Sequence, residues 1–320
     1  MTYLITGCAG FIGMSLAHKL LKKNKKVIGL DNMNQFYNEG FKKKRLSILK
    51  KEKNFQFINV DISNKKKIKN IFKKNKPKVV IHLAAQAGVR NSIQFPDLYL
   101  KSNLVGFFNI LESIRETKPK IFLFASSSSV YGYSKGKSFK EKDNTDKCLS
   151  FYGATKKSNE IMAHSYFHQF NLSIIGLRFF TVYGPWNRPD MAAYSFAKNI
   201  KNSKKINVYG KGNLRRDFTY IDDVIESIDK LIFKSLKIKK PFFEIFNIGN
   251  NRPIKVNRFI NIMEKNLNKK SKKIYKEKPK TDLIFTNSNS NKLIKFIQFK
   301  PQTTIENGLK LFFNWFNNKF

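Results

Sequence analysis

Two side chains four residues apart, Tyr152 and Lys156, could together move a proton. On a helix this spacing puts both side chains on one face, one turn from each other. A phenol has a pKa of about 10 and is a poor base at neutral pH, but an ammonium group held nearby favours the phenolate and lowers that pKa. Because many ordinary helices carry Tyr and Lys at this spacing, the pair indicates a base only if the chain also builds a hydride acceptor and a substrate pocket.

A run of hydroxyl side chains follows a strand-like segment earlier in the chain. Residues 120–125 read as a strand, and residues 126–129 are four serines. Ligands bind at the C-terminal ends of strands in parallel sheets, so these hydroxyls can hydrogen-bond a reacting oxygen and pass a proton. A polar turn without function is the alternative. A serine nucleophile is less attractive, because the G-x-S-x-G elbow is missing here.

The hydride acceptor is predicted at the N-terminus, where Gly7, Gly10 and Gly13 form G-x-x-G-x-x-G between a strand and a helix. Glycines allow a tight turn and let backbone N–H groups approach a pyrophosphate at the helix N-terminus. Asp31 ends the second strand, where its carboxylate could accept hydrogen bonds from ribose hydroxyls and would repel a 2′-phosphate. This favours NAD over NADP, although a turn-capping role for Asp31 is the alternative. Asp61, after the third strand, could read an adenine edge or could be another loop residue.

Strands and helices alternate along the first half of the chain. We expect strands at 3–6, 26–30, 55–60, 78–83, 120–125 and 172–177. Helical stretches lie between them, at 11–22, 65–74, 99–117 and 152–170. This alternation predicts an α/β fold with a doubly wound parallel sheet of Rossmann type. We divide the chain into an NAD-binding domain over 1–175 and a smaller α+β substrate lobe over 176–320, some segments of which return to the sheet. In the lobe we expect helices at 191–202, 222–233, 256–267 and 305–316, and strands at 206–209 and 244–248.

The composition is strongly basic, with a formal net charge of +40 over 320 residues, of which 41% are hydrophobic. Lysines are spread along the whole chain, which indicates a compositional bias and solvated faces rather than a nucleic-acid surface; a polyanion-binding module with a degenerate fold is the alternative.

Two cysteines, without metal spacing, suit a reducing cytoplasm. We expect no metal site. Apolar runs stay shorter than the roughly 18 residues that span a bilayer, and the strand at the N-terminus leaves no room for a signal peptide.

The motifs together resemble the extended short-chain dehydrogenase/reductases that act on nucleotide sugars. The resemblance covers essentially the whole chain and rests on the glycine turn, Asp31, Asp61, Leu83-Ala84-Ala85, Asn103-x-x-Gly106, the serine run with Tyr131-Gly132, and Tyr152-x-x-x-Lys156. Five segments, at 31–37, 85–90, 178–191, 215–223 and 299–303, are similar to the UDP-glucuronate 4-epimerases in particular. That family interconverts UDP-glucuronate and UDP-galacturonate through a 4-keto sugar with tightly bound NAD.

The resemblance implies a role for each catalytic residue. Tyr152, as phenolate, takes the proton of the sugar 4-hydroxyl while NAD accepts hydride from C4, and Ser127 bridges the hydroxyl and the phenol. Lys156 holds the nicotinamide ribose and lowers the pKa of Tyr152. The 4-keto sugar then turns and takes the hydride back on its other face. The resemblance also assigns to the NAD site Phe11, Ile12, Asn32, Ile62, Leu83, Ala84, Ala85 and Asn103.

Three arginines are candidates for the substrate's anionic groups. Arg216 suits a diphosphate by charge-assisted bonds, with a structural pair to Asp217 or Asp222 as the alternative. Arg188 could bind the sugar carboxylate together with Thr181, Ser128 and Ser129. Arg90 is a second cationic candidate, and each of these arginines could instead be a solvated surface residue. The chain departs from the family at Asn187, where relatives usually have Gly, and at 279–282, for which we predict no site.

Related enzymes with the same base catalyse other reactions. The 4,6-dehydratases carry Asp-Glu where this chain has Ser128 and Ser129, and the decarboxylases carry Glu at the second of these positions. Because this chain has no carboxylic acid at either position, oxidation of the sugar followed by return of the hydride is favoured over elimination. A 4-epimerase of neutral UDP-hexoses is the nearest competitor; it would not need Arg188 and usually has Asn in place of Thr181. The resemblance also implies a homodimer through the helices following Asp97 and Tyr152, and product use in polysaccharide synthesis.

Overall fold

A seven-stranded parallel sheet forms the centre of the protein in the computed structural model, which describes residues 1–34, 39–133, 138–279 and 281–319. The strand order is β10-β6-β5-β4-β1-β2-β3. The strands are β1 (Thr2–Thr6), β2 (Lys26–Asp31), β3 (Phe55–Asn59), β4 (Val79–His82), β5 (Ile121–Ser127), β6 (Ile174–Phe179) and β10 (Phe243–Ile248). The predicted doubly wound Rossmann fold is thereby confirmed.

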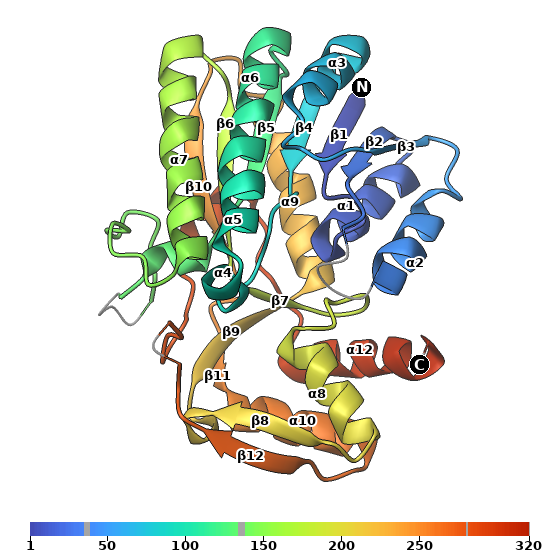
Figure 1. Ribbon diagram of the computed structural model, residues 1–320, viewed down its shortest axis with the longest axis vertical. Coiled ribbons are helices and arrows are strands. Elements are labelled where there is room, and N and C mark those ends of the chain that lie inside the picture. The colour runs from blue at the N-terminus through green and yellow to red at the C-terminus, as the bar shows by residue number, and fades with distance from the viewer. Residues whose placement is uncertain (35–38, 134–137, 280, 320) are drawn as a thin grey trace.

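Helices cover both faces of this sheet (Figure 1). One face carries α3 (Lys65–Asn75), α6 (Phe107–Thr117) and α7 (Phe151–Phe170), and the other carries α1 (Phe11–Lys22), α2 (Glu39–Leu49), α9 (Ile221–Ser235) and α11 (Asn291–Ile297). Because successive strand side chains point to opposite faces, Leu4 packs in one apolar core while Tyr3 and Ile5 pack in the other. The continuous apolar strands follow from burial on both sides.

The later part of the chain forms a lobe below the sheet in Figure 1. It contains the parallel pair β8 (Lys205–Tyr209) and β12 (Lys272–Lys276), and the helices α8 (Ala192–Lys201), α10 (Val256–Leu267) and α12 (Ile305–Lys319). A three-stranded sheet of β7 (Thr181–Tyr183), β9 (Arg215–Tyr220) and β11 (Pro253–Lys255) lies between the lobe and the main sheet. The division at residue 175 stays a prediction, since β6 crosses that position and β10 adds a strand to the main sheet.

The single helix expected at 99–117 is wrong in detail. The segment contains the end of α5 (Pro96–Tyr99), a π-helical stretch η1 (Leu100–Gly106) and then α6, after the short α4 (Asn91–Gln94). π-Helical turns are rare and concentrate at functional sites. Here the turn contains Asn103, whose buried side chain bonds to the loop that follows β4.

No helix within the described ranges is long and apolar enough to cross a membrane. Over those same residues, no group of three or more His, Cys, Asp or Glu side chains could hold a metal ion.

Candidate active site

A cavity of about 450 Å³ opens at the C-terminal ends of β1, β2, β4 and β5. The strand order reverses between β1 and β4, which is where ligands bind in doubly wound sheets. Most predicted site residues line it: Gly7, Gly10, Phe11, Ile12, Gly13, Asp31, Asn32, Ile62, Leu83, Ala84, Ala85, Ser127, Ser128, Ser129, Tyr152, Lys156, Thr181 and Arg188. The fold therefore brings the glycine turn, the serine run and the Tyr-Lys pair to one place.

The glycine turn is packed so closely that side chains would not fit in it. Gly7 has φ +72°, and a Cβ there would lie 2.8 Å from the backbone nitrogen of Ala84. A Cβ on Gly13 would lie 2.1 Å from the carbonyl oxygen of Gly7. Gly10 begins α1 without a side-chain cap, and the first turn has no acidic residue. A bare helix N-terminus of this kind favours an anion, so the turn fits the pyrophosphate of a dinucleotide.

Asp31 stands beside this turn and is fixed by several donors. Its carboxylate accepts hydrogen bonds from the backbone N–H of Ala9 at 3.1 Å and of Met33 at 2.9 Å, and pairs with the ammonium of Lys42 at 3.2 Å. Lys42 also donates to Asn34 at 2.7 Å and lines the cavity. The sequence gives no signal for Lys42, because it begins a basic run, 42–45, among many lysines. Residues 35–37 of the family-like segment 31–37 lie outside the described residues.

Two predicted cofactor residues stand behind the cavity wall rather than in it. Asp61 accepts a hydrogen bond from Asn32 at 3.0 Å and thereby holds a residue that does line the cavity. Burial pushes the pKa of Asp61 up, but hydrogen bonds from Ser63 and Asn32 outweigh it and the net shift is downward. Asn103 accepts from the backbone of Gln86 at 2.8 Å and donates to its carbonyl at 3.0 Å. Both side chains position other residues of the site.

The Tyr-Lys pair lies at the start of α7, where the Ser150 hydroxyl caps the helix by accepting from the backbone N–H of Gly153 at 3.0 Å. Burial raises the pKa of Tyr152, while a hydrogen bond with Ser127 and the positive charge of Arg188 act in the opposite direction. The Lys156 ammonium donates to the carbonyl of Ala125 at 3.0 Å, and burial lowers the pKa of Lys156 to about 8. In this structure the groups that favour the phenolate are therefore Ser127 and Arg188 rather than Lys156.

The serine run is held from below by a buried ion pair. Glu160 of α7 pairs with Arg178 of β6 at 2.7 Å and accepts from the Ser126 hydroxyl at 2.5 Å. Above this pair, the Ser127 and Ser129 hydroxyls lie 3.2 Å apart. These contacts tie the end of β5 to the helix that carries Tyr152, so the hydroxyl and the phenol keep a fixed relation.

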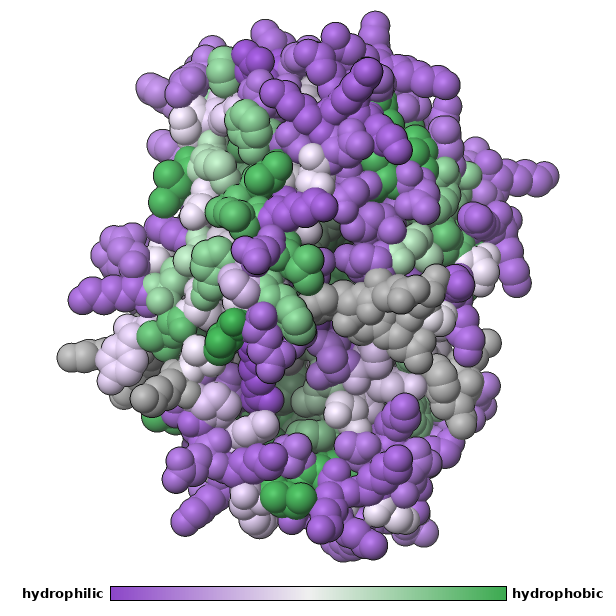
Figure 2. All heavy atoms as spheres, viewed as in Figure 1, coloured by the Kyte–Doolittle hydropathy of each residue, from purple (hydrophilic) through white to green (hydrophobic). Residues whose placement is uncertain are grey.

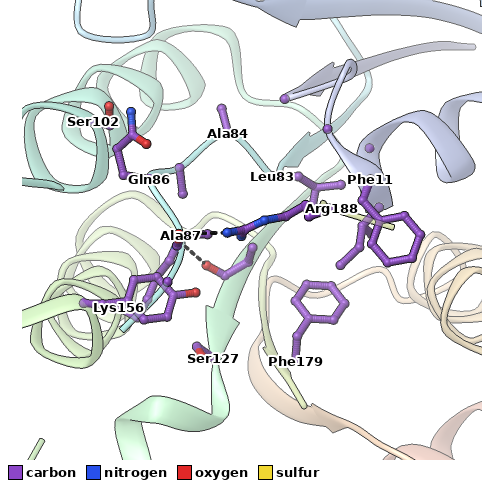
Figure 3. Close-up of a pocket in the computed structure, with 18 of the residues that line it drawn as sticks. Phe11, Leu83, Ala84, Gln86, Ala87, Ser102, Ser127, Lys156, Phe179 and Arg188 are labelled. Carbon is purple, nitrogen blue, oxygen red and sulfur yellow. Dashed lines mark hydrogen bonds between the residues drawn. The ribbon is translucent and has the colours of Figure 1, made fainter. Parts of the chain in front are cut away.

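Arg188 reaches across the cavity from the loop after β7 (Figure 3). Its guanidinium donates to the carbonyl oxygen of Ala87 at 3.1 Å and pairs with Asp190, with Nε 3.0 Å from Oδ1. A second cavity of about 180 Å³ shares Ser128, Ser129 and Thr181 with the first. Of the predicted carboxylate-binding residues, Ser128, Ser129 and Thr181 therefore line both cavities, and Arg188 lines the larger one.

The other two arginines differ in placement. Arg216 lines the smaller cavity and donates to the carbonyl of Arg215 at 2.9 Å. Among the described residues, Arg216 forms no ion pair with either alternative partner, Asp217 or Asp222, and the buried Asp217 carboxylate accepts from the Ser288 hydroxyl at 2.6 Å. Arg90 lines neither cavity; its side chain is half exposed, pairs with Asp282 at 3.0 Å and lies 4.2 Å from the ring centre of Tyr209. Lys280 of the irregular segment lies outside the described residues.

A scan against protein-family models matches residues 3–249 to the NAD dependent epimerase/dehydratase family. The chain belongs to this family. Protein CapI of Staphylococcus aureus is 46% identical over 99% of this chain and 98% of its own length. The UDP-glucuronate 4-epimerase of Thermodesulfobacterium geofontis is 41% identical over 98% of this chain and 95% of its own. The structure of UDP-glucuronic acid 4-epimerase from Bacillus cereus, in complex with UDP-glucuronic acid and NAD, is 32% identical, covers 100% of both chains and superposes with a TM-score of 0.93.

Membership of the NAD dependent epimerase/dehydratase family confirms the predicted family. Arg45, like Lys42, is a residue of the site that sequence reasoning missed. The buried guanidinium of Arg45 donates to the carbonyl oxygens of Ala9 at 3.2 Å, Trp186 at 2.7 Å and Asn187 at 3.3 Å. One side chain thus joins the glycine turn to the loop that carries Arg188. Asn187, the departure from the family pattern, is fully buried, and its side-chain oxygen accepts from the backbone N–H of Arg188 at 2.7 Å.

Proposed function

We propose that this protein is a UDP-glucuronate 4-epimerase that interconverts UDP-glucuronate and UDP-galacturonate with NAD kept bound. The observation that carries the proposal is the placement of a base and a cation in one cavity wall: Tyr152 with its partner Ser127, and Arg188 beside them. A proton-transfer group alone suits any sugar oxidation. A guanidinium within electrostatic reach of the same phenol adds recognition of an anionic sugar.

The chain's residues divide the work of the reaction. The glycine turn, Asp31 and the residues after β4 hold NAD, which supplies a hydride acceptor and donor when bound. Tyr152 removes the proton of the sugar 4-hydroxyl through Ser127 and returns it after the 4-keto sugar has turned over. Because burial raises the pKa of Tyr152, the base needs positive charge around it, which Arg188 supplies. Lys156, which donates to the Ala125 carbonyl in this structure, would hold the nicotinamide ribose when NAD is bound.

The remaining assignments concern the substrate's two anionic groups, the diphosphate and the sugar carboxylate. Arg216, in the smaller cavity, binds the diphosphate, and Arg188 with Ser128, Ser129 and Thr181 binds the sugar carboxylate. Arg90, half exposed and paired with Asp282, acts at the outer rim. The NAD-binding part is 1–175 and the UDP-sugar lobe is 176–320, joined at the cavity. Hydroxyls at Ser128 and Ser129 offer no acid for elimination, so the 4-keto sugar is reduced again rather than dehydrated.

We also propose a homodimer and a cytoplasmic location. Figure 2 shows apolar side chains gathered over α4 to α7. They include Ile93, Phe95, Leu98, Leu100, Val105, Phe108 and Ile161, each between 39% and 62% exposed. In the segment following Asp97, Leu100 and Phe108 are exposed, whereas Phe107 and Leu111 are buried in the protein's own core. An exposed apolar face over α4 to α7 supports pairing with a second copy.

The test is incubation of the purified protein with UDP-glucuronate, without added NAD, followed by anion-exchange chromatography. We expect UDP-galacturonate to appear, and we expect Tyr152→Phe to lower turnover by about 1,000-fold or more while the fold and the bound NAD remain. A protein that retains NAD but forms no UDP-galacturonate would refute the substrate. Full activity of Tyr152→Phe would refute the base.

A further inference from the structure

Arg188 is already paired with a carboxylate of the protein. Asp190 follows it by two residues, lies in the wall of the same cavity and meets the guanidinium at two points, with Nε to Oδ1 at 3.0 Å and NH2 to Oδ2 at 2.5 Å. Pro189 stands between them and restricts the backbone on both sides, so the spacing of the two charges is built into the loop. This fork-to-fork geometry is the one by which arginine binds any carboxylate.

A substrate carboxylate that binds Arg188 in this way must therefore take the place of Asp190. We propose that Asp190 is an internal substitute for the sugar carboxylate: it holds Arg188 when no uronate is bound, and yields the guanidinium edge to the uronate. This inference rests on the proposed function. It assigns Asp190 as a specificity-determining residue and makes uronate binding an exchange of one carboxylate for another.

The two side chains are unequally exposed, which makes the exchange feasible. The Arg188 side chain is 17% exposed and stays anchored by its bond to the Ala87 carbonyl, whereas the Asp190 side chain is 39% exposed. After displacement the Asp190 carboxylate can be hydrated without moving far, while the guanidinium remains in the cavity. The exchange leaves the number of charges around the guanidinium unchanged, so it avoids the cost of an unpaired buried charge.

The pair also bears on the turning of the 4-keto sugar. During that turn the sugar carboxylate leaves Arg188, and Asp190 is placed to take the guanidinium back. Arg188 lies close enough to Tyr152 for its charge to affect the pKa of the phenol. If Arg188 always has a carboxylate partner, the electrostatic environment of Tyr152 stays the same while the sugar turns. Without Asp190, the uronate should bind more tightly and turn more slowly.

A purely structural role for Asp190 predicts the opposite. If Asp190 served only to orient Arg188, its removal would weaken uronate binding. If Asp190 competes with the uronate, the measured dissociation constant equals the intrinsic one divided by the fraction of molecules with Arg188 released. An ion pair that leaves about one molecule in ten released weakens binding about tenfold. This asks slightly more of the pair than exposed ion pairs give, and suits a two-point pair whose guanidinium is mostly buried.

The experiment compares binding of two nucleotide sugars to Asp190→Asn in the NAD-loaded, catalytically inactive Tyr152→Phe background, by isothermal titration calorimetry. We expect UDP-glucuronate to bind about tenfold more tightly than without the Asp190 change, and UDP-glucose to change less than twofold. The matched control is Glu306→Gln, which removes an exposed carboxylate paired with Arg258 at 2.7 Å, and should change neither affinity.

In the active enzyme, Asp190→Asn should lower both KM and kcat for UDP-glucuronate, a combination that loss of orientation cannot produce. Unchanged or weaker UDP-glucuronate binding by Asp190→Asn overturns the inference, as does equal tightening of UDP-glucose. These results are separate from the proposed function. Failure of the protein with Asp190 and Tyr152 intact to form UDP-galacturonate refutes the reaction, whereas a tenfold tightening confined to the uronate would still establish Asp190 as the competing carboxylate.

Discussion

The two halves of the cavity are built in different ways. The cofactor half is centred on one short stretch, residues 7–13, whose fit depends on backbone atoms in fixed positions. The sugar half comes from the end of β5, the loop after β7, and β9, and depends on charged side chains such as Arg188 and Arg216. Those charged groups already have partners within the protein, Asp190 and backbone carbonyls.

The difference suits the two ligands. A backbone cradle cannot rearrange without unfolding the turn, which suits a cofactor that stays bound through every cycle. Charged side chains can exchange partners at little cost, which suits a sugar that must enter, turn over and leave. If the comparison holds, a substitution in the cofactor half should abolish NAD binding almost completely. A substitution in the sugar half should change substrate affinity or turnover by degrees.

The largest effect is expected from Gly13→Ala. A Cβ at this position would lie 2.1 Å from the carbonyl oxygen of Gly7, which is backbone and cannot move aside without distorting the turn. We expect NAD content and turnover both to fall by at least about 100-fold, measured by nucleotide release on denaturation and by product chromatography. Ser15→Ala, on the same helix and bonded only to the carbonyl of Phe11, is the control. A Gly13→Ala protein that keeps its NAD would show that the cradle is adjustable.

Arg45→Met should affect both halves at once. The change leaves carbonyls of the glycine turn and of the Arg188 loop without a charged donor, and we expect a loss of about 2–4 kcal/mol in the free energy of unfolding. NAD retention should fall and KM for the UDP-sugar should rise about tenfold, whereas Arg45→Lys should restore charge without the three-way contact and give an intermediate result. Urea unfolding and kinetics measure these effects.

Arg115→Met is the matched control for Arg45. Arg45 lies 5.6 Å from the ring centre of Phe41, and Arg115 lies 5.4 Å from that of Phe170, but on α6 away from the cavity. A rise in KM without loss of NAD in Arg45→Met would mean that the two halves are not coupled through this guanidinium.

The sequence alone predicts the cofactor half well, for a physical reason. A glycine turn between a strand and a helix is a local pattern, which the spacing of three glycines within seven residues marks directly. The alternation of strands and helices predicts the sheet for the same reason. Even so, Asp61 and Asn103 are placed behind the cavity, because whether a loop side chain faces inward depends on the packing of β3 and η1.

The sugar half is predicted less completely, because its contacts are distant in sequence. Arg45 sits in a basic run of a lysine-rich chain, and its role depends on carbonyls 141 residues further on. Asp190 is visible in the sequence, yet only the folded loop turns its carboxylate onto Arg188. Strand β9 escapes prediction because Arg215, Arg216 and Asp217 break the apolar pattern that marks the other strands.

The smallest expected effect concerns a buried histidine of the cofactor half and the loss of folding stability at acid pH. His82 ends β4 beneath the glycine turn, is buried, and its Nδ1 lies 2.8 Å from the Thr6 hydroxyl. Burial, with a lesser contribution from the charge of Lys156, lowers the pKa of His82 to about 3. In the unfolded chain the pKa returns to about 6.5, so between these values the unfolded state binds the extra proton and stability falls as pH falls.

From pH 7 to pH 5 this histidine should therefore lower the free energy of unfolding by about 2 kcal/mol. His82→Gln removes that proton uptake, so its unfolding free energy should decline less steeply over the same interval, by urea titration at both pH values. His168→Gln, which removes an exposed imidazole from α7, is the control. Parallel slopes for His82→Gln and wild type would mean that His82 takes up its proton inside the folded protein. The buried cofactor half would then tolerate a charge that its burial is expected to exclude.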